Sequence, residues 1–234
     1  MGLTIHYTLQ NNGDDAGQAI SKLRDYAAEL PFRELGSVIH LKDDACDWQK
    51  RGNDDDLRWL LIQAQGHVSQ EPYHYSIPVL ELYAFSSWPG EGCEEANFGL
   101  ARFPKTFETS QGIIETGLGK GWHWSSFCKT QYANEYGLDN FVKCHTLVVG
   151  MLDFAKHLNI LAEVSDEGEY WEKRDIEALV KEIGEWDSFI AGMAGQLKDA
   201  LADSKTGLSL YAPILERPDF EHLEMNTQLT GGQA

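Results

Sequence analysis

The chain has 234 residues, of which 42% are hydrophobic and 24% are charged, values close to the average of globular proteins. A chain of this length and composition can bury a sizeable core without disulfide bonds, which excludes a mainly disordered protein. No run of about 18 apolar residues is present, and the first residues lack the basic and apolar segments of a signal peptide. We therefore expect a soluble, cytoplasmic protein.

The composition is strongly acidic, with 37 acidic residues against 19 basic ones and a formal net charge of −18. Such a surface repels phosphate backbones and anionic lipids, so we expect neither a nucleic-acid partner nor a membrane partner. The acidic residues are scattered and interleaved with apolar ones, and solubility is the simplest role for them.

The four cysteines form no C-x-x-C pair, and none has a histidine at the short spacing of a structural zinc site. The aspartate-rich segment 42–58 lacks the alternating oxygen ligands of a calcium loop. We therefore predict no metal and no cofactor, and we expect reduced, partly buried thiols at Cys46, Cys93, Cys128 and Cys144.

The N-terminal segment predicts a β-α-β unit. Ile5, Tyr7 and Leu9 alternate with polar residues, which is typical of a half-buried strand. Apolar residues then recur at spacings of four and three between positions 16 and 30, which predicts an amphipathic helix that ends at Pro31. A second strand over 37–41 follows, so the helix is expected to cover one face of a sheet.

Strand-like segments dominate the middle of the chain, from Trp59 to Thr116. They have short connections bounded by Pro or Gly, and a succession of about six such strands predicts a mostly antiparallel sheet. The longest is expected to bend at Pro78, because proline is excluded from the centre of a ladder. The segments are 59–65, 73–77, 79–85, 98–103 and 112–116.

Two long helices are predicted in the C-terminal half, the first with a broad apolar stripe over 141–158. The second has apolar residues that step by four and three without a miss, and this face is expected to be buried. Its stripe consists of Leu179, Ile183, Trp186, Ile190, Met193, Leu197 and Ala200.

These elements predict an α+β fold: an antiparallel-rich sheet with an N-terminal β-α-β unit and two long C-terminal helices packed on it. We expect residues 1–224 to form a single α+β domain. Residues 225–234, which are rich in Gly and polar residues, are expected to form a disordered tail.

Two segments, 86–97 and 122–132, combine large aromatics with polar groups. An apolar wall with a few directed polar groups is typical of a ligand pocket, although large aromatics also serve simply to fill a core. Both segments lie at strand ends, and we expect residues 91–94 of the first and 122–124 of the second to lie within about 15 Å of each other, several strand spacings. The predicted ligand-binding residues are Trp88, Trp122, Trp124, Ser125, Lys129 and Tyr132.

His123 is the candidate for catalysis. A carboxylate from Glu91 or Glu95 would orient its ring and stabilise its cation, as a general base requires. The sequence contains no G-x-S-x-G elbow, H-E-x-x-H motif, Walker loop or Rossmann glycine pattern.

Three functional hypotheses follow. The first is a protein that binds a small ligand or peptide in an aromatic pocket. The second is a metal-independent hydrolase that uses His123 with a carboxylate from Glu91 or Glu95, and the third is an acidic protein-interaction module. The sequence predicts no oligomeric state and does not decide whether the protein is an enzyme.

Overall fold

The computed structural model describes residues 3–53, 55–203, 213–216, 220–223 and 225. Contacts divide the chain into two compact units, Leu3–Glu172 and a second unit that begins at Lys173. The single domain expected over 1–224 stays a prediction. Of the tail expected over 225–234, residues 226–234 lie outside the described residues.

The first unit is built on a six-stranded sheet with the order β12-β1-β11-β8-β6-β3. Every pair of neighbouring strands is antiparallel, which confirms the α+β class and the antiparallel-rich sheet. The strands are β1 (Thr4–Asn11), β3 (Ile39–Lys42), β6 (Glu81–Phe85), β8 (Phe98–Arg102), β11 (Trp122–Lys129) and β12 (Leu161–Asp166).

Alternation along the strands decides which side chains enter the core. Ile5 and Leu9 of β1 are fully buried, and their register partners on β11 are Cys128 and Trp124. Residues opposite each other in an antiparallel pair point to the same face, so these four side chains pack on one side of the sheet. The alternate residues His6 and Thr8 point to the other side, where His6 is exposed and Thr8 is half-buried.

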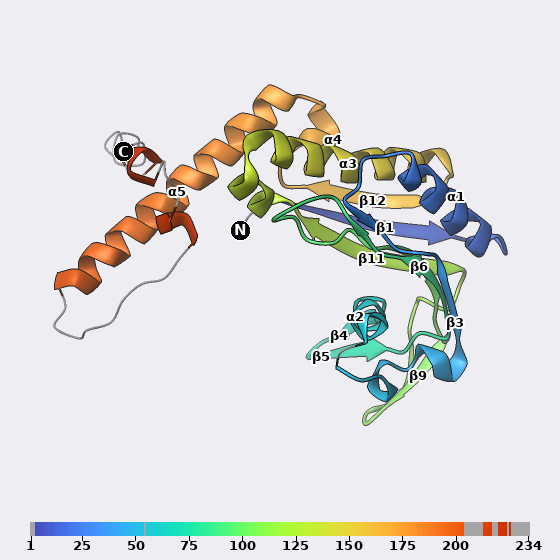
Figure 1. Cartoon of the computed structure of the whole chain (residues 1–234). Helices are drawn as coiled ribbons and strands as arrows, with labels where there is room; N and C mark the ends of the chain where they lie inside the picture. Colours follow the sequence, from blue (N-terminus) through green and yellow to red (C-terminus); the bar gives the residue numbers. More distant parts are fainter. Residues whose placement is uncertain (1–2, 54, 204–212, 217–219, 224, 226–234) are drawn as a thin grey trace. The chain divides into compact units, whose positions relative to one another are not determined.

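Two helices, α1 (Ala16–Ala28) and α3 (Leu138–His157), cover the core side of the sheet (Figure 1). The rings of Tyr26 and Phe154 stack between them with centroids 4.2 Å apart. α1 contacts β6 and β8, and α3 contacts β12, so the expected N-terminal unit and the first long C-terminal helix are confirmed.

The opposite side of the sheet carries α2 (Asp56–Gln63) and the hairpin of β4 (Gly66–Gln70) and β5 (Tyr73–Ile77) (Figure 1). The prediction of a strand over 59–65 is therefore wrong, because a short apolar run has no periodicity that separates strand from helix. Asp55 favours the helix, because its side chain accepts a hydrogen bond from the N–H of Leu57 and caps the first turn. The expected bend at Pro78 is also wrong, since β5 and β6 belong to different sheets.

Short elements complete the first unit. Two further ladders join β2 (Glu34–Leu35) to β7 (Ser87–Trp88) and β9 (Thr106–Thr109) to β10 (Gly112–Glu115). The remaining turns are the 3-10 helices η1 (Asp43–Cys46), η2 (Trp48–Lys50) and η3 (Gln131–Tyr136) and the short helix α4 (Tyr170–Lys173).

The second unit consists mainly of α5 (Ile176–Asp203), with the 3-10 helix η4 (Pro213–Glu216). Leu179 and Ile183 of the predicted stripe are buried, but Met193 is 58% exposed. The buried face instead continues through Ala191, which packs with Phe220 and Leu223, so the stripe expected from steps of four and three is partly wrong. The side chains of Leu197 and Ala200 lie outside the described ones.

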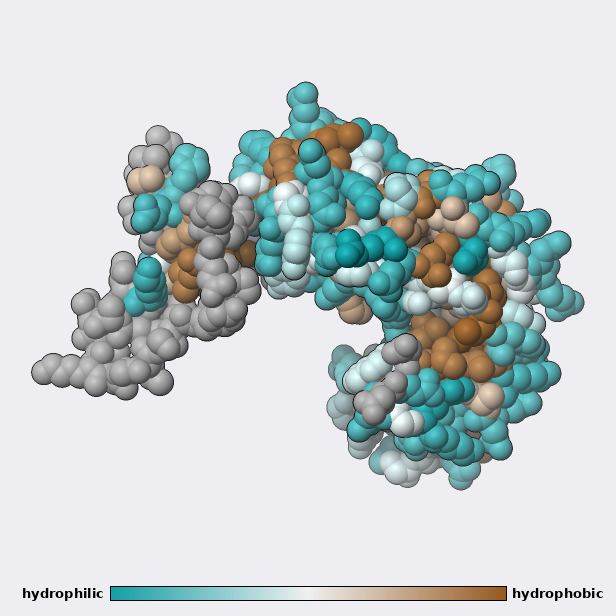
Figure 2. Space-filling view, in the orientation of Figure 1, coloured by the Kyte–Doolittle hydropathy of each residue, from teal (hydrophilic) through white to brown (hydrophobic). Residues whose placement is uncertain are grey.

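The visible face of the first unit is mainly hydrophilic, with a hydrophobic stretch near β3 (Figure 2). The outline of this unit is indented between the sheet and the part that carries α2 (Figure 2). Within the described part of the chain, no helix is both long and apolar enough to cross a membrane.

Candidate functional site

Two adjoining pockets lie between α2 and the side of the sheet that is not covered by α1 and α3. Their volumes are about 480 and 650 Å³, within the range of small-molecule sites. They share Ile62, Gln63 and Phe127 as common walls, and we refer to the two together as the groove.

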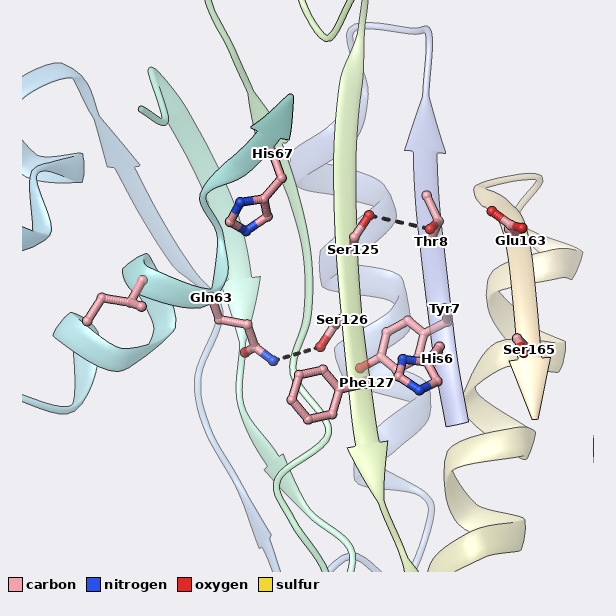
Figure 3. Close-up of a pocket in the computed structure, with 11 residues that line it drawn as sticks. His6, Tyr7, Thr8, Gln63, His67, Ser125, Ser126, Phe127, Glu163 and Ser165 are labelled. Carbon is pink, nitrogen blue, oxygen red and sulfur yellow. Dashed lines mark hydrogen bonds between the residues drawn. The ribbon is translucent and has the colours of Figure 1, made fainter. Parts of the chain in front are cut away.

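The first pocket lies over β12, β1 and β11 (Figure 3). The strand register sets its polar groups in rows, because His6 stands opposite Ser165 and Phe127, and Thr8 stands between Glu163 and Ser125. His67 of β4 and the end of α2 form the other wall. The lining residues are His6, Tyr7, Thr8, Ile62, Gln63, His67, Ser125, Ser126, Phe127, Glu163 and Ser165.

The second pocket lies between α2 and the β7–β8 connection, and its lining combines apolar side chains with carboxylates and amides. Trp59 and Phe127 stand at its edge and are 61% and 46% exposed, which is unusual for large aromatic side chains. The lining residues are Glu34, Leu57, Trp59, Leu60, Ile62, Gln63, Ser86, Glu95, Asn97 and Phe127.

The groove exists because β8 and β11 diverge. Their ladder has a single register pair, His123 with Ala101, and beyond it the space between the strands is filled by polar side chains. The Nδ2 of Asn97 donates to the Oε1 of Gln63 at 2.7 Å. The Nε2 of Gln63 donates in turn to the Oγ of Ser126 at 2.9 Å (Figure 3). These bonds fix the end of α2 against the sheet.

Asn97 is the most constrained polar residue of the groove. Its backbone carbonyl accepts the hydroxyl of Tyr7 at 2.7 Å and the indole N–H of Trp124 at 2.9 Å. Burial raises the pKa of Tyr7, so its hydroxyl remains a donor. Asn97 is only 8% exposed, and its side-chain Oδ1 has no hydrogen-bond partner among the described residues.

Among the described residues that line the groove, the permanently charged side chains are all carboxylates. Glu34 and Glu95 belong to the second pocket and Glu163 to the first, and no lysine or arginine lines either one. Within the described residues, none of the three carboxylates is in an ion pair, and neither His6 nor His67 is hydrogen-bonded to a carboxylate.

Of the residues predicted to bind a ligand, Ser125 lines the groove and Trp122 and Trp124 do not. Both tryptophans are buried on the helix-covered side of the sheet, where the ring of Trp122 contacts Tyr83 and Arg102. Ser125 faces the groove and its Oγ lies 3.4 Å from that of Thr8.

The other predicted binding residues lie outside both pockets. The indole of Trp88 donates to the carbonyl of Cys93 at 2.9 Å, and Arg33 lies over its ring while pairing with Glu91. Lys129 and Tyr132 contact each other, with Nζ 3.3 Å from the hydroxyl oxygen.

The proposed catalytic residues are not brought together by any hydrogen bond of the described residues. The ring of His123 bonds the carbonyl of Lys120 at 2.7 Å, whereas Glu95 lines the second pocket. The 91–94 loop contacts the far end of β11, where Cys93 Sγ lies 3.6 Å from Cys128 Sγ. His123 is five residues away along that strand, roughly 16 Å at the usual rise per residue. Catalysis by His123 stays a prediction.

Several residues of the groove carried no recognised signal in the sequence. His6 and Thr8 are the polar members of an alternating strand, so their exposure was predictable and their position over a pocket was not. Gln63 and Asn97 are 34 positions apart, and only the divergence of β8 from β11 brings them together.

No group of three or more His, Cys, Asp or Glu side chains in the described ranges is arranged to hold a metal ion. No protein-family model, curated protein or solved structure matches the chain. Geometry and chemistry are therefore the basis for assigning a role to the groove.

Proposed function

We propose that this protein binds a small organic molecule in the groove between α2 and the uncovered side of the sheet. The observation that carries this proposal is Asn97, a buried residue that lines the groove and whose Oδ1 has no hydrogen-bond partner in the part of the chain that the structure describes. A buried acceptor without a donor costs free energy, and a ligand N–H or O–H would recover it.

The rest of the groove supports the same role. It combines apolar walls with exposed aromatic faces at Trp59 and Phe127, and polar side chains occupy defined register positions on three strands. A mostly apolar cavity with a few fixed polar groups is the usual form of a small-molecule site.

Binding is favoured over hydrolysis because general acid–base catalysis needs an oriented acid or base within hydrogen-bond reach. The ring of His123 is held by a backbone carbonyl, and the histidines of the groove, His6 and His67, have no carboxylate hydrogen-bonded to them among the described residues.

The proposal is tested by ligand-observed NMR with a library of aromatic fragments that includes cationic, neutral and anionic members. Phe127→Ala removes a wall common to both pockets, so we expect it to weaken every groove-bound fragment by about fivefold or more, as loss of one apolar contact of roughly 1 kcal/mol implies.

The matched control is Ile113→Ala, which removes an apolar side chain that is 75% exposed on β10, outside both pockets. It should leave fragment binding unchanged. A library from which no member binds, or binding that is indifferent to Phe127→Ala, would refute the proposed function.

A further inference from the structure

We propose that the ligand of the groove carries a protonated amine, and that Glu34, Glu95, Trp59 and Asn97 recognise it in the second pocket. This inference rests on the proposed function and specifies the class of molecule that the groove takes.

Charge is the first argument. The second pocket is lined by two carboxylates, Glu34 and Glu95, and the adjoining pocket adds Glu163. Among the described residues that line the two pockets there is no lysine or arginine, so the permanent charges that an anionic ligand would meet there are all negative. The net charge of −18 favours the approach of cations as well.

Aromatic exposure is the second argument. Trp59 and Phe127 present large ring surfaces to the pocket, and a cation over such a ring is attracted by its π electrons. The guanidinium of Arg58 already lies 5.6 Å from the centroid of Trp59, although Arg58 does not line the pocket. One cation–π contact of the ring is thus made within the chain itself, by a residue outside the pocket.

Asn97 supplies the third argument, which is independent of charge. Its Nδ2 donates to Gln63 and its backbone carbonyl accepts from Tyr7 and Trp124. Its Oδ1 has no partner among the described residues, so a donor on the ligand would satisfy it. An ammonium has N–H donors and a quaternary ammonium has none, so the pocket should prefer the former.

The test compares four probes of one shape by isothermal titration calorimetry on the full chain at low salt. They are phenethylamine, its trimethylated quaternary analogue, 2-phenylethanol and 3-phenylpropionate. We expect phenethylamine to bind roughly tenfold more tightly than 2-phenylethanol, from two carboxylates and one ring. The quaternary analogue should be weaker than phenethylamine, and 3-phenylpropionate weakest.

Variants assign the effect to the pocket. Glu34→Gln and Glu95→Gln should each weaken phenethylamine by about threefold to fivefold, as exposed ion pairs do, and leave 2-phenylethanol unchanged. Glu108→Gln changes an exposed carboxylate on β9 outside both pockets and is the matched control.

The outcomes separate the two proposals. Binding of 2-phenylethanol or 3-phenylpropionate as tight as that of phenethylamine, and sensitive to Phe127→Ala, would overturn the preference for a cation and leave the groove as a binding site. Binding of phenethylamine that Glu34→Gln and Glu95→Gln do not weaken would also overturn it. If neither these four probes nor the fragment library binds, both proposals fail.

Discussion

His145 and Asp166 form a buried pair, with Nε2 of the ring 3.1 Å from Oδ2 of the carboxylate and neither side chain exposed. The other ring nitrogen lies 2.9 Å from the hydroxyl of Thr130, and the carboxylate also accepts the N–H groups of Gly168 and Trp171. These contacts join α3 to the end of β12 and to the residue before η3.

The pair predicts a pH-dependent stability. Burial alone would raise the pKa of Asp166, but the hydrogen bond and charge of His145 and the two backbone N–H groups hold it below its ordinary value. The folded pKa is lower than the unfolded one, so the carboxylate stabilises the fold above about pH 4, and this contribution is lost as the pH falls through the folded value.

Asp166→Asn should therefore lower the free energy of unfolding by about 3 kcal/mol at pH 7, because it breaks a buried pair. The difference from the unchanged chain should shrink in melts as the pH falls below about 4 and through the lowered pKa of the folded carboxylate, where the carboxylate becomes protonated. Asp25→Asn, an exposed change on α1, is the control and should have little effect at either pH. A difference that is constant with pH would contradict this reading of the pair.

A second prediction concerns the carbonyl of Asn97, which accepts both Tyr7 and Trp124. Tyr7→Phe removes one donor and should cost about 1 kcal/mol of stability. The double variant with Trp124→Phe leaves a buried carbonyl without either donor, so its cost should exceed the sum of the single costs. Chemical denaturation of the four chains measures this coupling, and strict additivity would show that another donor replaces the lost ones.

The fold was predictable in segments whose hydrophobic residues recur with a regular period and whose buried face packs against a single surface. The alternation of apolar residues in β1 and their spacing in α1 identify the buried face of each element, and both elements were predicted from the hydrophobic period alone. The segment over 59–65 was not, because seven apolar-rich residues fit either element and the side-chain cap at Asp55 decides for helix.

The site was less predictable, because a segment rich in aromatic residues can belong either to the core or to a pocket. Trp122 and Trp124 occupy the buried phase of β11, whereas Ser125 and Phe127 occupy the exposed phase and line the groove. A shift of one position thus separates these tryptophans from the exposed face, and which phase is buried depends on the helices that cover the sheet.

The cysteines support a third prediction. Cys93 Sγ lies 3.6 Å from Cys128 Sγ, so diamide should join them, with loss of two hydrogen atoms from the chain and reduction of the diazene to a hydrazine. The hydrogen bond between the two thiols, together with burial, raises the pKa of Cys93. Because the thiolate reacts, the oxidation should be slow at neutral pH and faster at higher pH.

Intact mass measures the loss of two hydrogens, and thermal melts should show a stabilisation of about 4 kcal/mol for a closed loop of this length. Cys93→Ala should abolish the mass change, and Cys46→Ala, at a separate buried thiol, should leave it unchanged. Oxidation of the Cys93→Ala chain at the rate of the unchanged chain would refute the assignment to Cys93.

The last prediction separates the buried and exposed faces of α5. Ile183 is 1% exposed and Met193 is 58% exposed, although both belong to the apolar stripe of this helix. Ile183→Asp places an unpaired charge in a buried position and should lower the free energy of unfolding by several kcal/mol, about 3 or more. Met193→Asp makes the same chemical change at an exposed position, so it should stay within about 0.5 kcal/mol. Guanidinium unfolding followed by circular dichroism measures both variants. Equal destabilisation by the two would mean that the whole stripe, and not the face through Ile183 and Ala191, is covered in solution.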